Sequence, residues 1–358
     1  MDPRRSRDAS KATIELVPTR WVPDWSRRRV RRNPNVVTGE DLRRGFLDIE
    51  IDFDGGFFAQ INWCLFVFAF AERHSLEARI TLVGENYRVD PARRDWLPEF
   101  FVWRRPFPVT EAESEFHRKH VTNFDELGFT ITPEPTLAEA HTLFFARLAV
   151  APDVLAEVDA FVADTFGGRV LGIHYRGTDK YREAEPVSYE AMRANAAELM
   201  ATGDFEAVFV TSDEAGFVTF MEESFPHARV ISRPNDERSS DWKAIHLDRS
   251  AGYSLIGYEA LCNALLLSRC DMLLRTTSFL SAWSAIFSPA IQIRTLNAPR
   301  EKMLWYPERE IMRSAAASPL SQRSAPNPSG SPVPSHPQSA ASPLTGYPES
   351  RPPLETLD

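Results

Sequence analysis

The residues best suited to chemistry follow an apolar run near the middle of the chain, in the segment His174-Tyr-Arg-Gly-Thr-Asp-Lys180. The run at 169–175 has the composition of a buried strand. Side chains on one face of a strand recur at every second residue, so His174 and Arg176 are expected to point the same way. Gly177 lets the backbone turn close to a ligand. Because ligands of open α/β sheets bind beyond the carboxyl ends of the strands, this segment predicts a binding site.

Two cations, Arg176 and Lys180, stand at this strand end. An arginine can bind phosphate oxygens in a forked manner, whereas a lysine acts as a point charge. At ~4 Å and an effective dielectric near 20, one such contact is worth about 4 kcal/mol of raw Coulomb energy. Stabilisation that grows as a leaving diphosphate gains charge lowers the barrier, so two cations could do the work of a divalent ion. The alternative is a plain salt bridge between Arg176 and Asp179 at the strand end.

Two further strand ends carry polar residues. Asp213 follows the strand predicted at 205–211, and an acid at this point could read a nucleoside. Thr277 and Ser278 follow the strand predicted at 271–276 and open a helix, where backbone N–H groups and hydroxyls suit a phosphate. In both cases the alternative is an ordinary helix cap. Parallel strands end at the same edge of a sheet, so all three polar strand ends are expected to converge.

Strands and helices alternate along most of the chain. Strands are predicted at 46–53, 79–83, 169–175, 205–211, 229–232, 271–276 and 290–294, and helices at 58–74, 136–148, 152–165, 186–200, 215–225, 257–268 and 278–287. This alternation predicts an α/β fold with parallel sheets that are covered on both faces. Residues 85–135 are expected to be rich in loops, and their aromatic cluster, Trp96, Phe100, Phe101 and Trp103, to pack mainly in the core. Gly55, Gly56 and Phe57 form a Gly-rich turn that suits a wall close against a ligand.

Length and composition limit the classes of protein. The chain has 358 residues, 43% of them hydrophobic and 25% charged, which predicts about two globular domains plus tails. A net charge of −9 argues against nucleic acid as a partner. Residues 1–44 are rich in Arg and predict a basic, poorly ordered arm, with contact to an anionic surface as the alternative. Ser and Pro dominate from 314 to 358, which predicts a disordered tail.

The apolar runs and the cysteines bear on location. The longest apolar run, 64–71, is far shorter than the ~20 residues that a membrane-spanning helix needs. The three cysteines lie in apolar stretches without metal-ligand spacing, and an odd number of such thiols suits a reducing compartment. A cytoplasmic location is therefore expected.

At these residues the sequence resembles the fucosyltransferase superfamily, which includes the α1,6-fucosyltransferases, bacterial nodulation fucosyltransferases and protein O-fucosyltransferases. The signature is a strand that ends in His-x-Arg, extended in the α1,6 enzymes to His-x-Arg-x-Thr-Asp-Lys, and it matches 174–180. A second block, Thr/Ser-Asp-Asp/Glu after a strand, matches 211–214. A third, Leu-Ser-x-x-Asp followed by a strand that ends in Thr and Ser, matches 267–278. The resemblance covers about residues 46–312 and is specific in its second half.

The resemblance implies a GT-B-like fold, in which two Rossmann-like, doubly wound domains face a cleft. The N-terminal domain, 45–166, would lie on the acceptor side, and the C-terminal domain, 167–313, would bind the GDP-sugar. The implied activity is an inverting glycosyltransferase that moves L-fucose from GDP-fucose to a glycan or glycoconjugate acceptor, with no metal or other cofactor. A GT-B transferase for another nucleotide sugar is the alternative.

The resemblance also implies roles for single residues. Arg176 would hold the β-phosphate, and Lys180 would assist at the phosphates or the reacting centre. The other donor contacts would come from His174 and Asp179, which bind or orient the donor, from Asp213, which reads the guanine or ribose, and from Thr277 and Ser278, which touch phosphate.

The sequence departs from the α1,6 enzymes at the expected catalytic base. The glutamate that follows the lysine in those enzymes corresponds by spacing to Ala184, which stands between Glu183 and Glu185. An inverting displacement needs a carboxylate that takes the acceptor proton, and either glutamate could supply it after a one-residue shift. Ala184 also leaves open a catalytically silent domain that binds a nucleotide sugar or a glycan.

Overall fold

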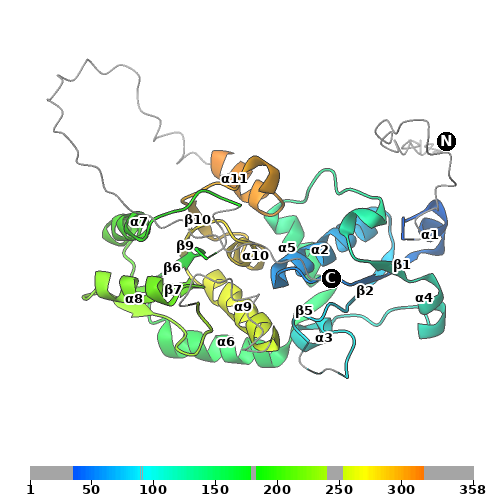
Figure 1. Cartoon of the computed structure of the whole chain (residues 1–358), viewed down its shortest axis with the longest axis horizontal. Helices are drawn as coiled ribbons and strands as arrows, with labels where there is room; N and C mark the ends of the chain where they lie inside the picture. The colour runs from blue at the N-terminus through cyan, green and yellow to red at the C-terminus, as the bar shows by residue number, and fades with distance from the viewer. Residues whose placement is uncertain (1–34, 89, 91, 179–182, 240–252, 318–358) are drawn as a thin grey trace, which may run out of the picture. The chain divides into compact units, whose positions relative to one another are not determined.

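Two parallel sheets organise the chain in the computed structural model, which describes residues 35–88, 90, 92–178, 183–239 and 253–317. We call the part around the smaller sheet the first lobe and the part around the larger sheet the second lobe (Figure 1). Both lobes belong to one unit that ends at Ala315. The predicted Asp179 and Lys180 lie outside the described residues, as do 1–34 of the predicted arm and 318–358 of the predicted tail.

The first lobe is built on strand β1 (Phe46–Ile51), all six residues of which are buried. β1 pairs in parallel with β2 (Glu77–Leu82) on one side and with β4 (Lys119–Val121) on the other. Helix α2 (Phe57–Arg73) connects β1 to β2 and is buried over most of its surface, because it packs against the sheet and against helices of both lobes. An apolar helix of this kind is expected in a core rather than on a surface.

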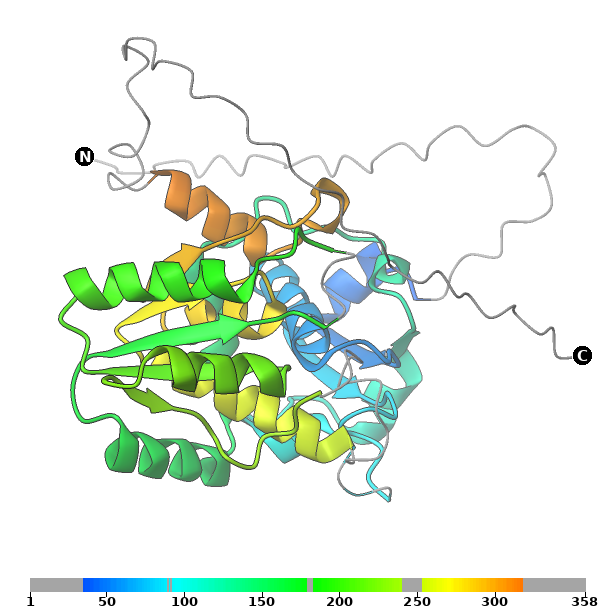
Figure 2. The same ribbon diagram turned by 60° about the vertical axis from the view of Figure 1, so that its left-hand side comes forward.

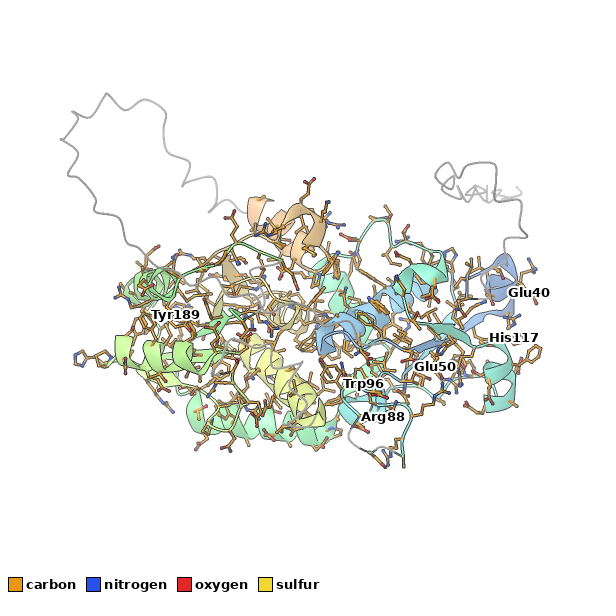
Figure 3. All side chains as sticks on the ribbon, in the orientation of Figure 1. Glu40, Glu50, Arg88, Trp96, His117 and Tyr189 are labelled. Carbon is orange, nitrogen blue, oxygen red and sulfur yellow. The ribbon has the colours of Figure 1, made fainter. Side chains whose placement is uncertain are left out.

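Short elements complete the first lobe. They are α3 (Leu97–Phe100), β3 (Phe101–Trp103), α4 (Glu111–His117), a 3-10 helix (Phe124–Leu127), α5 (Leu137–Phe145) and β5 (Leu148–Val150), which pairs antiparallel with β3. The region expected to be mostly loops thus holds three-residue strands, which are too short to show a periodic pattern. Trp96, which Figure 3 labels, is buried there together with Phe100 and Phe101, as predicted for core residues, and Trp103 packs against the same core while partly exposed.

The second lobe has a five-stranded parallel sheet in the order β10-β9-β6-β7-β8. Its strands are β6 (Val170–Tyr175), β7 (Ala207–Ser212), β8 (Arg229–Ile231), β9 (Met272–Arg275) and β10 (Gln292–Thr295). Its helices are α6 (Pro152–Thr165), α7 (Tyr189–Thr202), α8 (Ala215–Ser224), α9 (Tyr253–Ser268) and α10 (Phe279–Phe287). Counted along the lobe, the strand order is 3-2-1-4-5, which is the Rossmann arrangement with its switch point between β6 and β9.

Helices cover both faces of this sheet, as Figure 2 shows. On one face Leu171 and Ile173 of β6 pack with Met192 of α7 and Phe217 of α8. On the other face Gly172 lies so close to the end of α9 that an added Cβ would be 3.2 Å from Leu267 of that helix and 2.9 Å from the sulfur of Cys270, which follows it. Burial on both faces explains the continuous apolar runs of these strands. The predicted α/β architecture with parallel sheets is confirmed, and the second lobe has the Rossmann strand order.

The ends of the folded region differ from the prediction. Helix α1 (Gly39–Arg44) lies within the predicted arm, where Thr38 and Asp41 form a capping box and Asp41 is 3.0 Å from the ammonium of Lys119. At the other end, α11 (Glu308–Ala317) continues past the predicted start of the tail at 314. At α1, the capping box and the ion pair with Lys119 therefore stabilise a helix in a segment whose composition predicted poor order. The domain boundary at 166/167 stays a prediction. None of the helices in the described ranges is both long and apolar enough to cross a bilayer.

Candidate active site

A cleft of about 390 Å³ opens where the chain leaves the carboxyl ends of β1, β6 and β7. The first lobe contributes Gly55, Gly56 and Phe57, and the second contributes His174, Arg176, Asp213 and Ser278. With Glu183, eight predicted site residues from five separate segments thus line one cavity. A larger cavity of about 720 Å³, lined by residues such as Arg79 and Trp103, contains none of them.

Arg176 stands directly after β6, at the switch point of the sheet. Its backbone N–H donates to Thr276 Oγ1 over 2.8 Å, which ties the end of β6 to the residue after β9. Its side chain is 23% exposed, and Nε lies 3.1 Å from Asp213 Oδ2. The guanidinium is therefore oriented by a carboxylate while it faces the cleft. His174, two residues earlier, is buried and also lines the cleft, as the strand alternation predicted.

Asp213 holds the turn that carries Arg176. Besides its contact with Arg176, its carboxylate accepts hydrogen bonds from Thr178 Oγ1 over 2.6 Å and from the Gly177 N–H over 3.2 Å. Asp213 is itself buried at the end of β7. These contacts give it a positioning function, whereas its predicted contact with a nucleoside stays a prediction.

A second carboxylate lies so close to Gly177 that it occupies the space a side chain would need. An added Cβ would lie 2.0 Å from Glu214 Oε1. Glu214 is fixed by Tyr189, whose hydroxyl donates to Glu214 Oε2 and which lies on α7 (Figure 3). Burial is the main cause that raises the pKa of Glu214. The backbone turn after Arg176 is therefore supported by two carboxylates, Asp213 and Glu214, each of which accepts a hydrogen bond from a hydroxyl group.

The start of α10 already uses two backbone amides within the protein. The Thr277 N–H donates to Asn297 Oδ1 over 2.8 Å, and the Ser278 N–H donates to Glu308 Oε1 over 2.8 Å. The backbone amides that could face a phosphate here are therefore those of the first turn of α10, which begins at Phe279. The Ser278 side chain lines the cleft, whereas Thr277 lines a small neighbouring cavity, and phosphate contacts through their hydroxyls stay a prediction.

The two candidate bases differ in their position relative to the cleft. Between them, Ala184 is buried and forms an antiparallel bridge with Pro299, and the Arg300 N–H donates to the Glu183 carbonyl over 2.7 Å. Glu183 lines the cleft, while Glu185 is exposed and is not among the described residues that line it. Of the two glutamates, Glu183 has the position that the predicted base needs.

The wall from the first lobe is close and partly aromatic. Gly55 needs to be glycine, because a Cβ there would lie 2.0 Å from a ring carbon of Phe53. Gly56 caps α2 and has open space at its Cβ position. The carbonyl of Gly55 accepts a hydrogen bond from Gln60 Nε2 over 3.0 Å, which fixes the turn. The predicted wall at Gly55, Gly56 and Phe57 therefore lies where a ligand of the second lobe would meet it.

Sequence reasoning missed a polar cluster on the β8 side of the cleft, formed by Asp236, Glu237, Glu259 and Asn263. Asn263 Nδ2 donates to Asp236 Oδ2 over 2.8 Å, and the Glu237 N–H donates to Glu259 Oε2 over 3.0 Å. Asn263 Oδ1 is buried and has no hydrogen-bond partner among the described residues. Burial is the main cause that raises the pKa of Glu259 to about 7. Two polar residues four apart in the otherwise apolar α9 were the signal that could have revealed this cluster.

Aromatic rings also line the cleft. Phe279 begins α10, and Trp305 follows the 3-10 helix Glu301–Met303. Their rings are nearly parallel, at 5°, with centroids 6.1 Å apart. Sequence reasoning missed both, because only the fold brings residue 305 to the start of α10.

The comparisons with known proteins found similarity among solved structures. No protein-family model matches the chain, and no curated protein matches it. Among solved structures, it is similar to fucosyltransferase NodZ from Bradyrhizobium, at 18% identity over 68% of this chain and 94% of that chain, with a TM-score of 0.45. It is also similar to NodZ alpha-1,6-fucosyltransferase soaked with GDP-fucose, at 18% identity over 68% of this chain and 93% of that chain, with a TM-score of 0.43. POFUT1 in complex with GDP is similar at 10% identity over 69% of this chain and 97% of that chain, with a TM-score of 0.42.

Proposed function

We propose that the chain is an inverting, metal-independent glycosyltransferase that transfers L-fucose from GDP-fucose to an acceptor hydroxyl. The observation that carries this proposal is the placement of Arg176, a cation that a buried carboxylate orients into a cleft at the switch point of a Rossmann sheet. This is the position at which such sheets bind nucleotide phosphates. The sequence resemblance supplies the identity of the donor.

The polar cluster offers the donor a second contact in the same cleft. Arg176 follows β6 at the centre of the sheet, whereas Asp236 and Glu237 follow β8 and the other two members of the cluster lie on α9. All of them line the cleft that Arg176 lines. A nucleotide whose diphosphate lies at Arg176 would therefore have its base toward Glu259 and Asn263.

The polar cluster supports guanine as the base. Glu259 offers carboxylate oxygens, and Asn263 offers an amide oxygen that lacks a partner within the described residues. Guanine carries adjacent N–H donors on N1 and N2, which two neighbouring acceptors can bind together. A buried acceptor that stays unpaired costs about 1–3 kcal/mol, so a base without these donors would bind more weakly.

The transfer step uses Glu183 and Arg176. The acceptor oxygen attacks the anomeric carbon of fucose from the face opposite the diphosphate, and its proton passes to the Glu183 carboxylate. The bond between the anomeric carbon and the phosphate oxygen breaks, and its electron pair stays on the departing GDP. Arg176 neutralises the charge that develops there, with Lys180 as the second predicted cation. Positive charge from side chains is the physical support for a reaction that needs no metal.

The release of GDP from GDP-fucose tests the proposal. Arg176→Ala should lower the rate by about 10²–10³-fold, the usual effect of removing one group that stabilises developing charge. Arg169→Ala is a matched control, since it removes a half-exposed arginine that precedes the amino end of β6. A chelator should leave the rate unchanged. If GDP raises the melting temperature but no variant or wild-type chain releases GDP from the donor, the protein is a silent binding domain.

The base assignment has its own test. Glu183→Gln should abolish transfer to an acceptor, because the acceptor proton then has no carboxylate to receive it. Glu185→Gln, two residues away and exposed, should retain transfer. The reverse ranking of the two variants would show that Glu185 is the base.

A further inference from the structure

The cavity of about 720 Å³ lies in the first lobe, apart from the cleft. Its lining comes from the end of α2, the start of β2, the residues that follow β3 and those that precede β5. Helix α2 begins at the cleft and ends at this cavity, and its 17 residues at about 1.5 Å each separate the two places by about 25 Å. The two cavities share none of the described residues that line them. The volume is that of a site for a small molecule, which is about 300–1,000 Å³.

Two arginines of this cavity have N–H groups that form no hydrogen bond with the described residues. Arg147 donates from Nη2 to Glu72 Oε2 over 2.8 Å, whereas its Nη1 has no partner in the described ranges. Arg105 is exposed, and no described residue binds its side chain. Arg79, the third arginine of the lining, is by contrast paired with two carboxylates. Glu72 and Glu77 of the lining are exposed, so water and salt screen their repulsion of an anion.

A buried phenylalanine of α2 orients the cationic and aromatic groups of the cavity. The guanidinium carbon of Arg147 lies 5.5 Å from the ring centroid of Phe68. The Trp103 ring packs edge-on against the same ring, with centroids 5.9 Å apart. The Arg104 N–H donates to the Arg147 carbonyl over 2.8 Å, which joins the end of β3 to the residue before β5. Both groups are therefore in place before a ligand arrives, which reduces the ordering cost of binding.

The apolar part of the lining includes two aromatic rings. Trp103 is partly exposed, so its indole ring offers a flat surface to a ligand. Phe107 adds a second ring, which lies 5.1 Å from the guanidinium carbon of Arg79 and 5.7 Å from the ring of Phe46. The cavity thus combines cationic donors with a flat apolar surface.

We propose that this cavity is a second ligand site, which binds a small molecule made of a flat apolar ring and one anionic group. The anion would lie between Arg105 and Arg147, and the ring would stack on Trp103. Guanidinium groups bind anionic oxygens through two N–H donors at once, and indole rings stack on other flat rings. The inference does not depend on the function proposed above, since no residue of the cleft takes part in it.

Saturation-transfer NMR on the full chain tests the proposal with three probes. Naphthalene-2-sulfonate combines the ring with the charge and should bind. Naphthalene-2-sulfonamide keeps the ring without the charge, and hexanesulfonate keeps the charge with a chain in place of the ring. Each of these two should have a dissociation constant at least about fivefold higher than that of naphthalene-2-sulfonate, because it lacks one of the two kinds of contact.

Variants locate the probe. Arg105→Gln should raise the dissociation constant of naphthalene-2-sulfonate about tenfold, the size expected for one charge-assisted contact. Arg104→Gln is the matched control, because Arg104 is exposed and is not among the described residues that line the cavity. Trp103→Ala should raise the dissociation constant about fivefold, and Trp103→Phe should restore most of the affinity. Arg176→Ala, which removes a cation of the cleft, should leave the binding unchanged.

Three results would overturn the site. They are no binding of naphthalene-2-sulfonate, equal binding of either of the other two probes, and equal effects of Arg104→Gln and Arg105→Gln. Loss of binding in Arg176→Ala with full binding in Arg105→Gln would place the probe in the cleft and would also overturn it. The proposed function stands or falls separately, because its test measures the release of GDP.

Discussion

Glu259 offers the sharpest test of the polar cluster, through the pH dependence of stability. Its side chain is 7% exposed in α9, and burial is the largest cause of its raised pKa. The negative charges of Asp236 and Glu237 raise the pKa further, whereas the Glu237 N–H and the charge of Arg233 lower it. The net result is a pKa of about 7 in place of the ordinary 4.5.

The sign of the effect follows from proton binding. Between pH 4.5 and 7 the folded chain holds this proton and the unfolded chain has lost it, so stability falls as pH rises through this range. Below pH 4.5 the Glu259 carboxyl hardly lowers the free energy of unfolding, and above pH 7 it lowers it by the full amount. With about 1.4 kcal/mol for each pH unit, this cost is about 3 kcal/mol.

The variant Glu259→Gln removes the charge and keeps an oxygen for the Glu237 N–H. Its unfolding free energy, measured in urea, should exceed that of the wild type by about 3 kcal/mol at pH 8 and by about 1 kcal/mol or less at pH 5. Glu222→Gln makes the same change at an exposed site of α8 and should stay within about 0.5 kcal/mol at both pH values. Equal effects of Glu259→Gln at the two pH values would refute the reasoning, as would a loss of stability at pH 8.

The same proton links Glu259 to the donor. If the carboxylate accepts N–H groups of guanine, GDP favours its ionised form, so binding near pH 6.5 should release a proton. Calorimetry in two buffers of different ionisation enthalpy measures that release, and Glu259→Gln should abolish it while it weakens GDP binding. A more stable variant that binds its ligand less well is the usual signature of a group kept for function.

Two further predictions concern the frame of the cleft. Glu308→Gln leaves the buried charge of Arg275 without a carboxylate, and denaturant unfolding should show a loss of about 3–5 kcal/mol. Gly55→Ala brings a Cβ against the ring of Phe53 and should cost about 1–3 kcal/mol more in the same assay than Gly56→Ala, where the Cβ has open space.

The parts of the fold that the sequence predicted are those with a local signal. β6, β7 and β9 are buried on both faces, so they read as continuous apolar runs, and the polar residues after them mark the edge where ligands bind. β4 is different, because its three residues become a strand only by pairing with β1. The sequence of three residues does not indicate which strand they will pair with.

The site residues divide in the same way. Arg176 and Asp213 follow directly from strands, and their meeting is a consequence of parallel order. Trp305 and Glu308 reach the cleft region through the return of the chain after β10, and they contact residues about 30 positions earlier. The choice between Glu183 and Glu185 needed the lining of the cleft, which no spacing rule supplies.

The buried contact of Glu308 determines which amides at the start of α10 can bind an anion. The start of a helix attracts a phosphate through unpaired amides and the helix dipole. Here Glu308 already accepts the Ser278 N–H and Asn297 accepts the Thr277 N–H, so the amides that are left for an anion belong to the first turn of α10 itself. A diphosphate at the switch point between β6 and β9 would therefore lie between this helix end and the guanidinium of Arg176, which Asp213 orients.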